Sequence, residues 1–279
     1  MPRPSPSRGA TGQTSGGTSV AGTKSWIWAA VPLLLMAALL VVAPQYGIRW
    51  RADSFLAMVA LLAAELGVIG WLINDRPIGA FIDNRNRISL SKLQAGAWTV
   101  IVLAGFATAA AFNTMAPDNG TGYVTALAVQ IPGELLLAMG ISATSLVASP
   151  ALLSLKAAET PSDTANSQAA TKMNVAQVSS NGKVATNDAT TGASWADLVT
   201  GEEVGNVGYP DLGKIQQALI TLLLLGCYMA YTYSALARMT TVTVTSLPLL
   251  DPSFVWLMGI SHATYLAYKA APHTQSAQT

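Results

Sequence analysis

Two ionisable side chains lie inside otherwise apolar stretches, and they are the first candidates for chemistry. Glu65 lies in the middle of the stretch 55–73, and His262 lies in the stretch 254–271, directly after a serine. An ionised group at the centre of a bilayer costs at least ~2.5 kcal/mol unless it is paired or wetted. Glu65 therefore either is protonated and hydrogen-bonded or lines a polar path. His262 is either a buried, satisfied histidine or a pathway residue.

Enzymatic chemistry is hard to build from the remaining residues. Ser261 and His262 are adjacent, and neighbours on a helix point about 100° apart, so they cannot act together as nucleophile and base. Ser142 could meet His262 across two helices, but no Gly-x-Ser-x-Gly turn or Asp partner supports a hydrolase. His262, His273 and Cys227 lack the spacing of metal ligands. The sequence thus indicates a protein that is not an enzyme and has no cofactor or metal.

Composition places the chain in a membrane. Only 10% of its residues are charged, whereas a soluble domain usually carries about 25%. A bilayer core of ~30 Å needs about twenty apolar helical residues, and six segments approach that length. These are Trp26 to Ala43, Phe55 to Ile73, Ala95 to Phe112, Pro132 to Leu155, Ile215 to Leu236 and Phe254 to Ala271. We therefore expect an all-α polytopic membrane protein with six transmembrane helices.

The polar segments divide the chain further. Residues 1–23 and 157–192 contain few large apolar side chains, too few to offset the entropy of ordering, so we expect a disordered tail and a disordered cytoplasmic linker. After the linker, Ser194 followed by Asp197 predicts a short capped helix. The remaining units are a transmembrane hairpin at 24–74, two units at 75–156 and 193–271, and a C-terminal tail at 272–279.

Lysine and arginine are distributed unevenly about the expected spans. Even without the long fourth loop, eight lie on the side of the two termini and three on the other. Because cations in short loops stay on the cytoplasmic side, both termini are expected in the cytoplasm. The formal net charge of +1 gives no reason to expect a nucleic acid partner.

An internal repeat relates the second half of the chain to the first. At an offset of 122 residues, one block of polar residues coincides with another, and each block immediately precedes a span. The coinciding residues are Gly79, Asn84, Leu90, Lys92 and Gln94 with Gly201, Asn206, Leu212, Lys214 and Gln216. The sequence Met-Gly-Ile-Ser also occurs twice, from Met139 and from Met258. Each unit contains two spans, so spans 3–4 and 5–6 are expected to be parallel repeats related by an axis along the membrane normal.

The repeated residues suggest two roles. Gly140 and Gly259 expose backbone, and Ser142 and Ser261 carry hydroxyls, so we expect close helix packing at these positions. The polar positions at the cytoplasmic boundary either anchor helix ends, with the lysines near lipid phosphates, or form a surface for a protein partner. These candidate partner-binding residues are Asn84, Lys92, Gln94, Asn206, Lys214 and Gln216.

Five stretches of the sequence resemble a group of uncharacterised bacterial multi-pass membrane proteins. They are Arg87 to Gln94 with Trp98, Gly140 to Ser142, Gly201 to Asn206, Asp211 to Gln216 and Gly259 to His262. The resemblance covers roughly residues 75–271 and leaves out the tail and the first two spans. It implies a bacterial inner-membrane protein, and it carries over no catalytic residues, because that group has no established activity.

Two functions follow from these observations. The first is a non-enzymatic scaffold or membrane anchor whose polar blocks bind a protein partner in the cytoplasm, because the repeated polar residues lie at the boundary rather than near the midplane. The alternative is a small channel or transporter with Glu65 and His262 along its pathway. Membrane lipids surround either protein, and a homo-oligomer is compatible with both.

The expected topology can be tested with fusion reporters. A reporter after Thr279 and one within 165–187 should read cytoplasmic, whereas reporters within 117–123 or 240–246 should read external, because the cations lie on the side of the termini. Protease cleavage of 157–192 in intact spheroplasts would contradict both the six-span count and the parallel repeat.

Overall fold

A computed structural model describes residues 25–115, 126–241 and 243–276. The expected disordered tail at 1–23 lies outside these residues. The elements are almost all helical, with one short β-hairpin. The fold therefore belongs to the all-α class that the sequence predicts.

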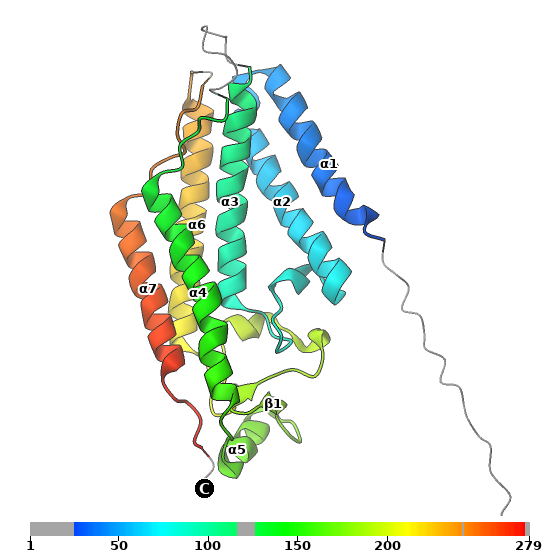
Figure 1. Cartoon of the computed structure of the whole chain (residues 1–279), viewed down its shortest axis with the longest axis vertical. Helices are drawn as coiled ribbons and strands as arrows, with labels where there is room; N and C mark the ends of the chain where they lie inside the picture. Colours follow the sequence, from blue (N-terminus) through cyan, green and yellow to red (C-terminus); the bar gives the residue numbers. More distant parts are fainter. Residues whose placement is uncertain (1–24, 116–125, 242, 277–279) are drawn as a thin grey trace, which may run out of the picture.

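Six long helices form an elongated bundle (Figure 1). They are α1 (Ile27–Val42), α2 (Arg51–Asn74), α3 (Leu90–Asn113), α4 (Gly133–Ala157), α6 (Leu212–Arg238) and α7 (Pro252–Ala270). Two short 3-10 turns, η1 (Ala43–Tyr46) and η2 (Ile48–Trp50), join α1 to α2. Within the described part of the chain, five helices are long and apolar enough to cross a membrane: α1 extended to Tyr46, α2 extended back to Ile48, α3, α4 and α6. The chain is thus compatible with a multi-pass membrane protein.

Side-chain caps set the starts of three helices. Ser89 accepts a hydrogen bond from the amide of Lys92, and Asp211 accepts one from the amide of Lys214, so α3 and α6 begin about one turn before the apolar sequence does. Asp251 caps α7, with Pro252 in its first turn, as expected. These helices begin before the spans expected from Ala95 and Ile215, because apolar content marks the membrane portion of a helix and not its first turn.

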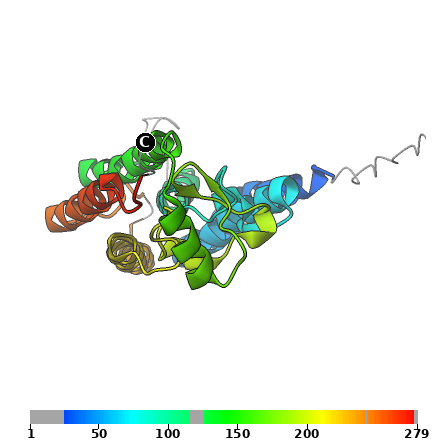
Figure 2. The same cartoon turned by 90° about the horizontal axis from the view of Figure 1, so that it is seen from below.

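The helices divide into two groups. In Figures 1 and 2, α4, α6 and α7 lie together beside α3, whereas α1 and α2 lie on the other side of α3. Trp98 and Phe55 are completely buried between these helices, as are Leu135 and Met258. The outward faces of the helices instead carry exposed leucine, valine and tryptophan, as a lipid-facing surface does.

The segments at one end of the bundle fold together into what we call the loop module, comprising residues 75–89, 157–211 and 271–276 (Figure 1). It lies where α3 and α6 begin and where α4 and α7 end. Its elements are η3 (Pro77–Phe81), α5 (Asp163–Met173), the antiparallel strands β1 (Ser180–Asn181) and β2 (Val184–Ala185), η5 (Thr190–Gly192) and η6 (Trp195–Leu198). The short helix expected from Ser194 and Asp197 is confirmed as η6, with both hydrogen bonds of a capping box.

The expectation of disorder at 157–192 was wrong. Ser162 caps α5, and small apolar side chains of this segment pack with valines that follow it in the chain. The packed residues are Ala169, Ala170, Val178, Ala185, Val204 and Val207. The composition of the segment is too polar to form a core alone, but it folds because residues outside the segment supply the rest of that core.

The described part of the expected C-terminal tail, residues 272–276, also belongs to the module. The amide of Ser162 donates to the carbonyl of Gln275 at 2.9 Å, and the amide of Gly205 donates to the hydroxyl of Thr274 at 2.9 Å. Thr274 is buried. These contacts hold the chain after α7 against the start of α5 and against the 201–206 turn.

Two glycines bring the end of α2 against η3. A Cβ added to Gly70 would lie 2.6 Å from the Ala80 nitrogen and 2.7 Å from the Pro77 oxygen, and one added to Gly79 would collide with Gly70. Gly67, one turn earlier on α2, has room, since its nearest neighbour would be 3.9 Å away. The loop module therefore contacts α2 through two positions that have no room for a side chain.

Gly70→Ala should lower the stability of the purified protein, because the added methyl overlaps backbone that cannot move away easily. We expect a loss of about 1–3 kcal/mol, typical of an overpacked site, seen as a lower melting temperature in detergent. Gly67→Ala on the same helix is the control and should melt at least as high as the wild type. Equal melting temperatures for the two variants would contradict the close approach.

Candidate functional site

A buried carboxylate, Glu202, lies at the junction between the loop module and the bundle. Its Oε1 accepts a hydrogen bond from Arg85 Nη2 at 2.8 Å and lies 3.7 Å from Lys214 Nζ, while its Oε2 pairs with Lys269 Nζ. Arg85 precedes α3, Lys214 is in the first turn of α6, and Lys269 is in the last turn of α7. All four side chains are buried. One carboxylate therefore joins three cations from three separate parts of the chain.

The surrounding charges determine the protonation of this carboxylate. Burial would raise the pKa of Glu202, but the charges of Lys214, Lys269 and Arg85 outweigh burial and hold the pKa well below its ordinary value of 4.5. Arg85 is paired with a second carboxylate, since its Nε and Nη2 donate to Asp83 at 2.9 and 2.6 Å. Glu202 is thus ionised at neutral pH and acts as a permanent counter-charge.

Two further buried ion pairs flank Glu202. Arg87 donates from Nε to Asp197 at 3.0 Å and from Nη1 to the Gly201 carbonyl at 2.9 Å, which ties η6 to the start of α3. On the other side, Lys156 pairs with Glu203, and its Nζ also donates to the Ala271 carbonyl at 2.6 Å. These pairs connect the end of α4 with the segment after α7. The cluster of charges therefore fastens the loop module to four helices.

A column of polar side chains leads from this cluster into the bundle along α4 and α7. Lys269 Nζ donates to the Tyr265 hydroxyl at 2.6 Å and to the Ser149 hydroxyl. Those two hydroxyls are 3.2 Å apart. About one helical turn deeper, Ser145 Oγ lies 2.6 Å from His262 Nδ1. Two groups of polar contacts, one at Lys269 and one at His262, thus follow each other from Glu202 toward the middle of the bundle, one helical turn apart.

His262 is the centre of a polar cluster that four helices build, which we call the histidine cluster. Besides Ser145 from α4, the Gln217 Nε2 of α6 lies 3.2 Å from His262 Nδ1. Gln217 Nε2 also donates to Gln94 Oε1 of α3 at 2.7 Å, and Gln94 Nε2 donates to Thr221 Oγ1 at 2.8 Å. Each of these five side chains is buried.

The hydrogen bonds fix the tautomer of His262. Gln94 Nε2 faces the main-chain carbonyl of Gln217 at 3.4 Å, and a carbonyl can only accept, so the amide nitrogen of Gln94 is correctly assigned. Gln94 Oε1 can only accept, so the side-chain atom of Gln217 that faces it must be the amide nitrogen. The same nitrogen also donates to His262 Nδ1. Nδ1 is therefore an acceptor, and the proton of the neutral imidazole is on Nε2. That buried Nε2 has no hydrogen-bond partner among the described residues.

An apolar layer lies on the far side of the histidine cluster from the loop module. Met258 is one turn before His262 on α7, and Leu135 and Ala138 hold the corresponding part of α4; all three are completely buried. Trp98 and Tyr228 complete the layer from α3 and α6, with ring centroids 6.0 Å apart. The polar column therefore reaches the cluster from the loop module and stops at this layer.

The six candidate partner-binding residues do not form one exposed surface. Asn84 and Gln216 are exposed and Lys92 and Asn206 are half-buried, but Gln94 and Lys214 are buried inside the structure. Lys92 Nζ donates to the Ile82 carbonyl at 2.9 Å, and Lys214 Nζ donates to the Thr200 carbonyl at 3.0 Å. Both lysines therefore tie the preceding loop to a helix start through main-chain carbonyls, and Lys214 is buried rather than near lipid phosphates as expected.

The four candidate helix-packing residues divide in the same way. Ser142 and Ser261 are buried where α4 and α7 pack side by side, but the close approach expected at Gly140 is not found among the described residues, since an added Cβ there meets none of their atoms within 4 Å. At Gly259 an added Cβ would lie 3.7 Å from Ile141, an ordinary contact. The serines, rather than the glycines, mark the contact between these two helices.

Glu65 and His262 lie on different helices, α2 and α7, and no hydrogen bond joins them among those described. Glu65 is half-buried, and its Oε2 makes no hydrogen bond to a described residue. The structure thus brings His262 together with Gln94 and Ser145, and leaves Glu65 outside the cluster.

Several residues of the site have no signal of their own in the sequence. Glu202, Arg85 and Lys269 are polar residues next to spans, where charged side chains are ordinary. The repeat pairs Gln94 with Gln216 and so gives no reason to select Gln217. In the structure it is the neighbouring Gln217 that is buried and donates a hydrogen bond to Gln94. Glu202 does lie within the Gly201 to Asn206 stretch noted in the sequence, but nothing in that stretch predicts that Glu202 pairs with three buried cations.

No protein family, curated protein or solved structure matches this chain. The resemblance to bacterial multi-pass membrane proteins stays a prediction.

Glu202→Gln should destabilise the folded protein strongly, because three buried cations lose their counter-charge. Removing one partner of a buried ion pair typically costs about 3–5 kcal/mol. Glu159→Gln is the comparison variant: Glu159 pairs with one buried lysine, Lys183, but its own side chain is 53% exposed to screening water, so its loss should cost less than the loss of Glu202. Thermal unfolding of both variants in detergent at pH 7 measures the difference.

The same measurement at lower pH provides a second check. Since the folded-state pKa of Glu202 is depressed below 4.5, its contribution is complete above that pH and is lost as the pH falls through the folded value. The difference in melting temperature between wild type and Glu202→Gln should therefore shrink below pH 4.5. A difference that stays constant with pH would contradict the ionised state of Glu202.

Proposed function

We propose that this chain is a small proton channel or transporter of the bacterial inner membrane, with His262 on the pathway. The observation that carries the proposal is the buried neutral imidazole, whose Nδ1 accepts hydrogen bonds in the histidine cluster and whose neighbours continue as hydroxyls and an ammonium toward the loop module. Buried ionisable groups at membrane depth are expensive and are retained mainly for function. No catalytic residue is proposed.

The proposal includes a sixth span, α7. This helix has 19 residues, enough to cross most of a bilayer core. His262 and Lys269 lower its apolar content, but both are buried against α4 and α6, and its exposed positions include Trp256, Leu257 and Ile260. Because both ionisable residues of α7 face protein, the outer face of the helix is largely apolar. With six spans, the loop module and both termini lie on one side, which the cation distribution assigns to the cytoplasm.

A proton would travel in short steps along the column. Protonation of the neutral imidazole takes place at Nδ1, the nitrogen that faces Ser145. Ser145 can pass on a proton only if its own hydroxyl is resupplied, and the Ser149–Tyr265–Lys269 group lies one turn, about 6 Å, toward the loop module. One bridging water spans such a distance. The apolar layer above His262 separates this half of the pathway from the opposite side, as an alternating-access or gated mechanism requires.

A duplication accounts for the way in which the two halves meet. Ser89 and Asp211 cap α3 and α6 at equivalent positions of the repeat, and Lys92 and Lys214 then fold back onto loop carbonyls. Ser142 and Ser261, equivalent in the Met-Gly-Ile-Ser sequences, are both buried between α4 and α7. In this proposal the histidine cluster lies where the two parallel units meet. The first unit has Ala143 at the position of His262, so only the second unit supplies an ionisable side chain there.

A second proposed function is the scaffold or anchor for a cytoplasmic protein. It is favoured by the order of the loop module, which buried ion pairs hold rigidly on the bundle. Its candidate contacts are reduced to Asn84 and Gln216, the two exposed positions. Crosslinking from these two residues in cells should capture the same protein, and capture of lipid or of this chain alone would remove the support for a scaffold.

His262→Gln should abolish proton flux through the purified protein in liposomes, since glutamine keeps a polar side chain but cannot take up a proton. A pH-sensitive dye inside the vesicles measures the flux after an imposed pH step. His273→Gln is the control, because that histidine lies in the loop module outside the column and should conduct as the wild type. Glu65→Gln should also leave the flux unchanged, because Glu65 is outside the cluster.

The variants must keep equal melting temperatures for the comparison to hold. Proton flux through His262→Gln at the wild-type rate, or no flux through the wild type at any imposed gradient, would overturn the proposal.

A further inference from the structure

The hairpin of α1 and α2 contains a groove that is separate from the proton pathway. It has a volume of about 900 Å³ and is open to the side. Its walls are aliphatic over most of their length, with Leu35 and Leu39 on α1 facing Ala57 and Leu61 on α2. Both walls belong to helices that are long and apolar enough to cross a membrane. The neighbours of this groove are therefore lipid acyl chains.

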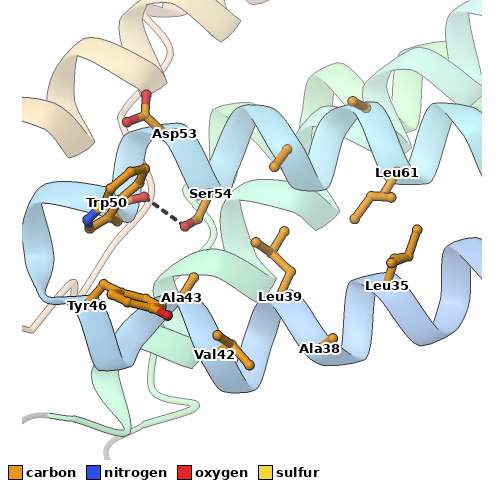
Figure 3. A pocket seen from close by; sticks show the side chains of 12 residues that line it. Leu35, Ala38, Leu39, Val42, Ala43, Tyr46, Trp50, Asp53, Ser54 and Leu61 are labelled. Atoms are coloured by element: carbon orange, nitrogen blue, oxygen red, sulfur yellow. Dashed lines mark hydrogen bonds between the residues drawn. The ribbon is translucent and has the colours of Figure 1, made fainter.

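One end of the groove is polar and aromatic. Figure 3 shows Tyr46, Trp50 and Asp53 together near the turn between the helices, with Leu35 and Leu61 at the opposite end. Tyr46 and Trp50 meet edge to face with ring centroids 6.5 Å apart, and both are largely exposed. Aromatic rings at the end of a span mark the level of lipid headgroups. The groove therefore runs from headgroup level into the acyl region.

The charge at the polar end selects among headgroups. Asp53 is the single charged residue among the described residues that line the groove. It is exposed, and its carboxylate accepts a hydrogen bond from the Tyr233 hydroxyl at 3.2 Å. A carboxylate can accept further hydrogen bonds, and the faces of Tyr46 and Trp50 attract a cation. A carboxylate beside two aromatic rings is suited to an ammonium group.

We propose that this groove binds a phospholipid whose headgroup carries an amine, with the ammonium at Asp53 and one acyl chain between α1 and α2. The volume lies within the range of ~300–1,000 Å³ usual for sites of small molecules. Ser54 also lines the groove, but it is buried and its hydroxyl donates to the Trp50 carbonyl at 2.7 Å, so Asp53 is the more accessible of the two to a headgroup. The groove thus combines an apolar wall for the chain with an anionic, aromatic end for the amine.

Native mass spectrometry of the full-length protein tests the proposal, with phosphatidylethanolamine and phosphatidylglycerol of identical acyl chains as competing probes. The wild type should retain phosphatidylethanolamine preferentially. Asp53→Asn should lower that preference by about fivefold, the size of one exposed ion pair. Glu134→Gln is the matched control, because it removes a carboxylate from α4, outside the groove, and should leave the preference unchanged.

A second variant tests the place of the acyl chain. Ala60 lines the groove and is exposed, so Ala60→Trp should fill the groove and reduce retention of both lipids while the melting temperature stays unchanged. An unchanged lipid preference in Asp53→Asn, or wild-type retention in Ala60→Trp, would overturn the proposal. A dimer of the chain that Ala60→Trp dissociates would also overturn it, since a second copy would then occupy the groove.

Discussion

The ion pairing of Glu202 is the interaction on which the rest of the structure depends. A buried lysine or arginine is tolerated only beside an opposite charge, and Glu202 serves Arg85, Lys214 and Lys269 at once. Those cations come from the segment before α3, the start of α6 and the end of α7. The relative positions of three helices are therefore fixed at one carboxylate, and the loop module that carries it cannot move independently of the bundle.

The polar interior of the bundle follows from this arrangement. Lys269 is held by Glu202 and directs its remaining hydrogen bonds to Ser149 and Tyr265, so these two hydroxyls on the facing sides of α4 and α7 have a partner. Deeper in the bundle, hydrogen bonds connect Gln94, Gln217 and His262 across three helices. Because these side chains face protein, the outer surfaces remain free to be apolar. The buried His262 and Lys269 of α7 contribute much of its low apolar content.

The two groups of helices carry different chemistry. The group of α3, α4, α6 and α7 encloses charged and polar side chains, and its interior connects with the loop module. The α1–α2 hairpin is aliphatic, lies to one side of α3, and is polar mainly at its turn. The proposed proton pathway lies in the first group and the proposed lipid site in the second, so substitutions that test one need not disturb the other.

The sequence by itself determined the features that depend on near neighbours in the chain. Apolar blocks predicted long helices at all six places, and the caps at Ser194 and Asp251 were recognised because a cap contacts amides only two or three residues away. The tertiary structure decided everything that depends on distant residues. Arg85 and Glu202 are 117 positions apart, the order of 157–192 depends on Val204 and Val207, and Gln94 bonds to Gln217 rather than to its repeat equivalent Gln216. A shift of one residue turns a helical side chain by about 100°. The partners of a buried polar group therefore depend on how each helix is rotated about its own axis. A repeat in the sequence does not give that rotation.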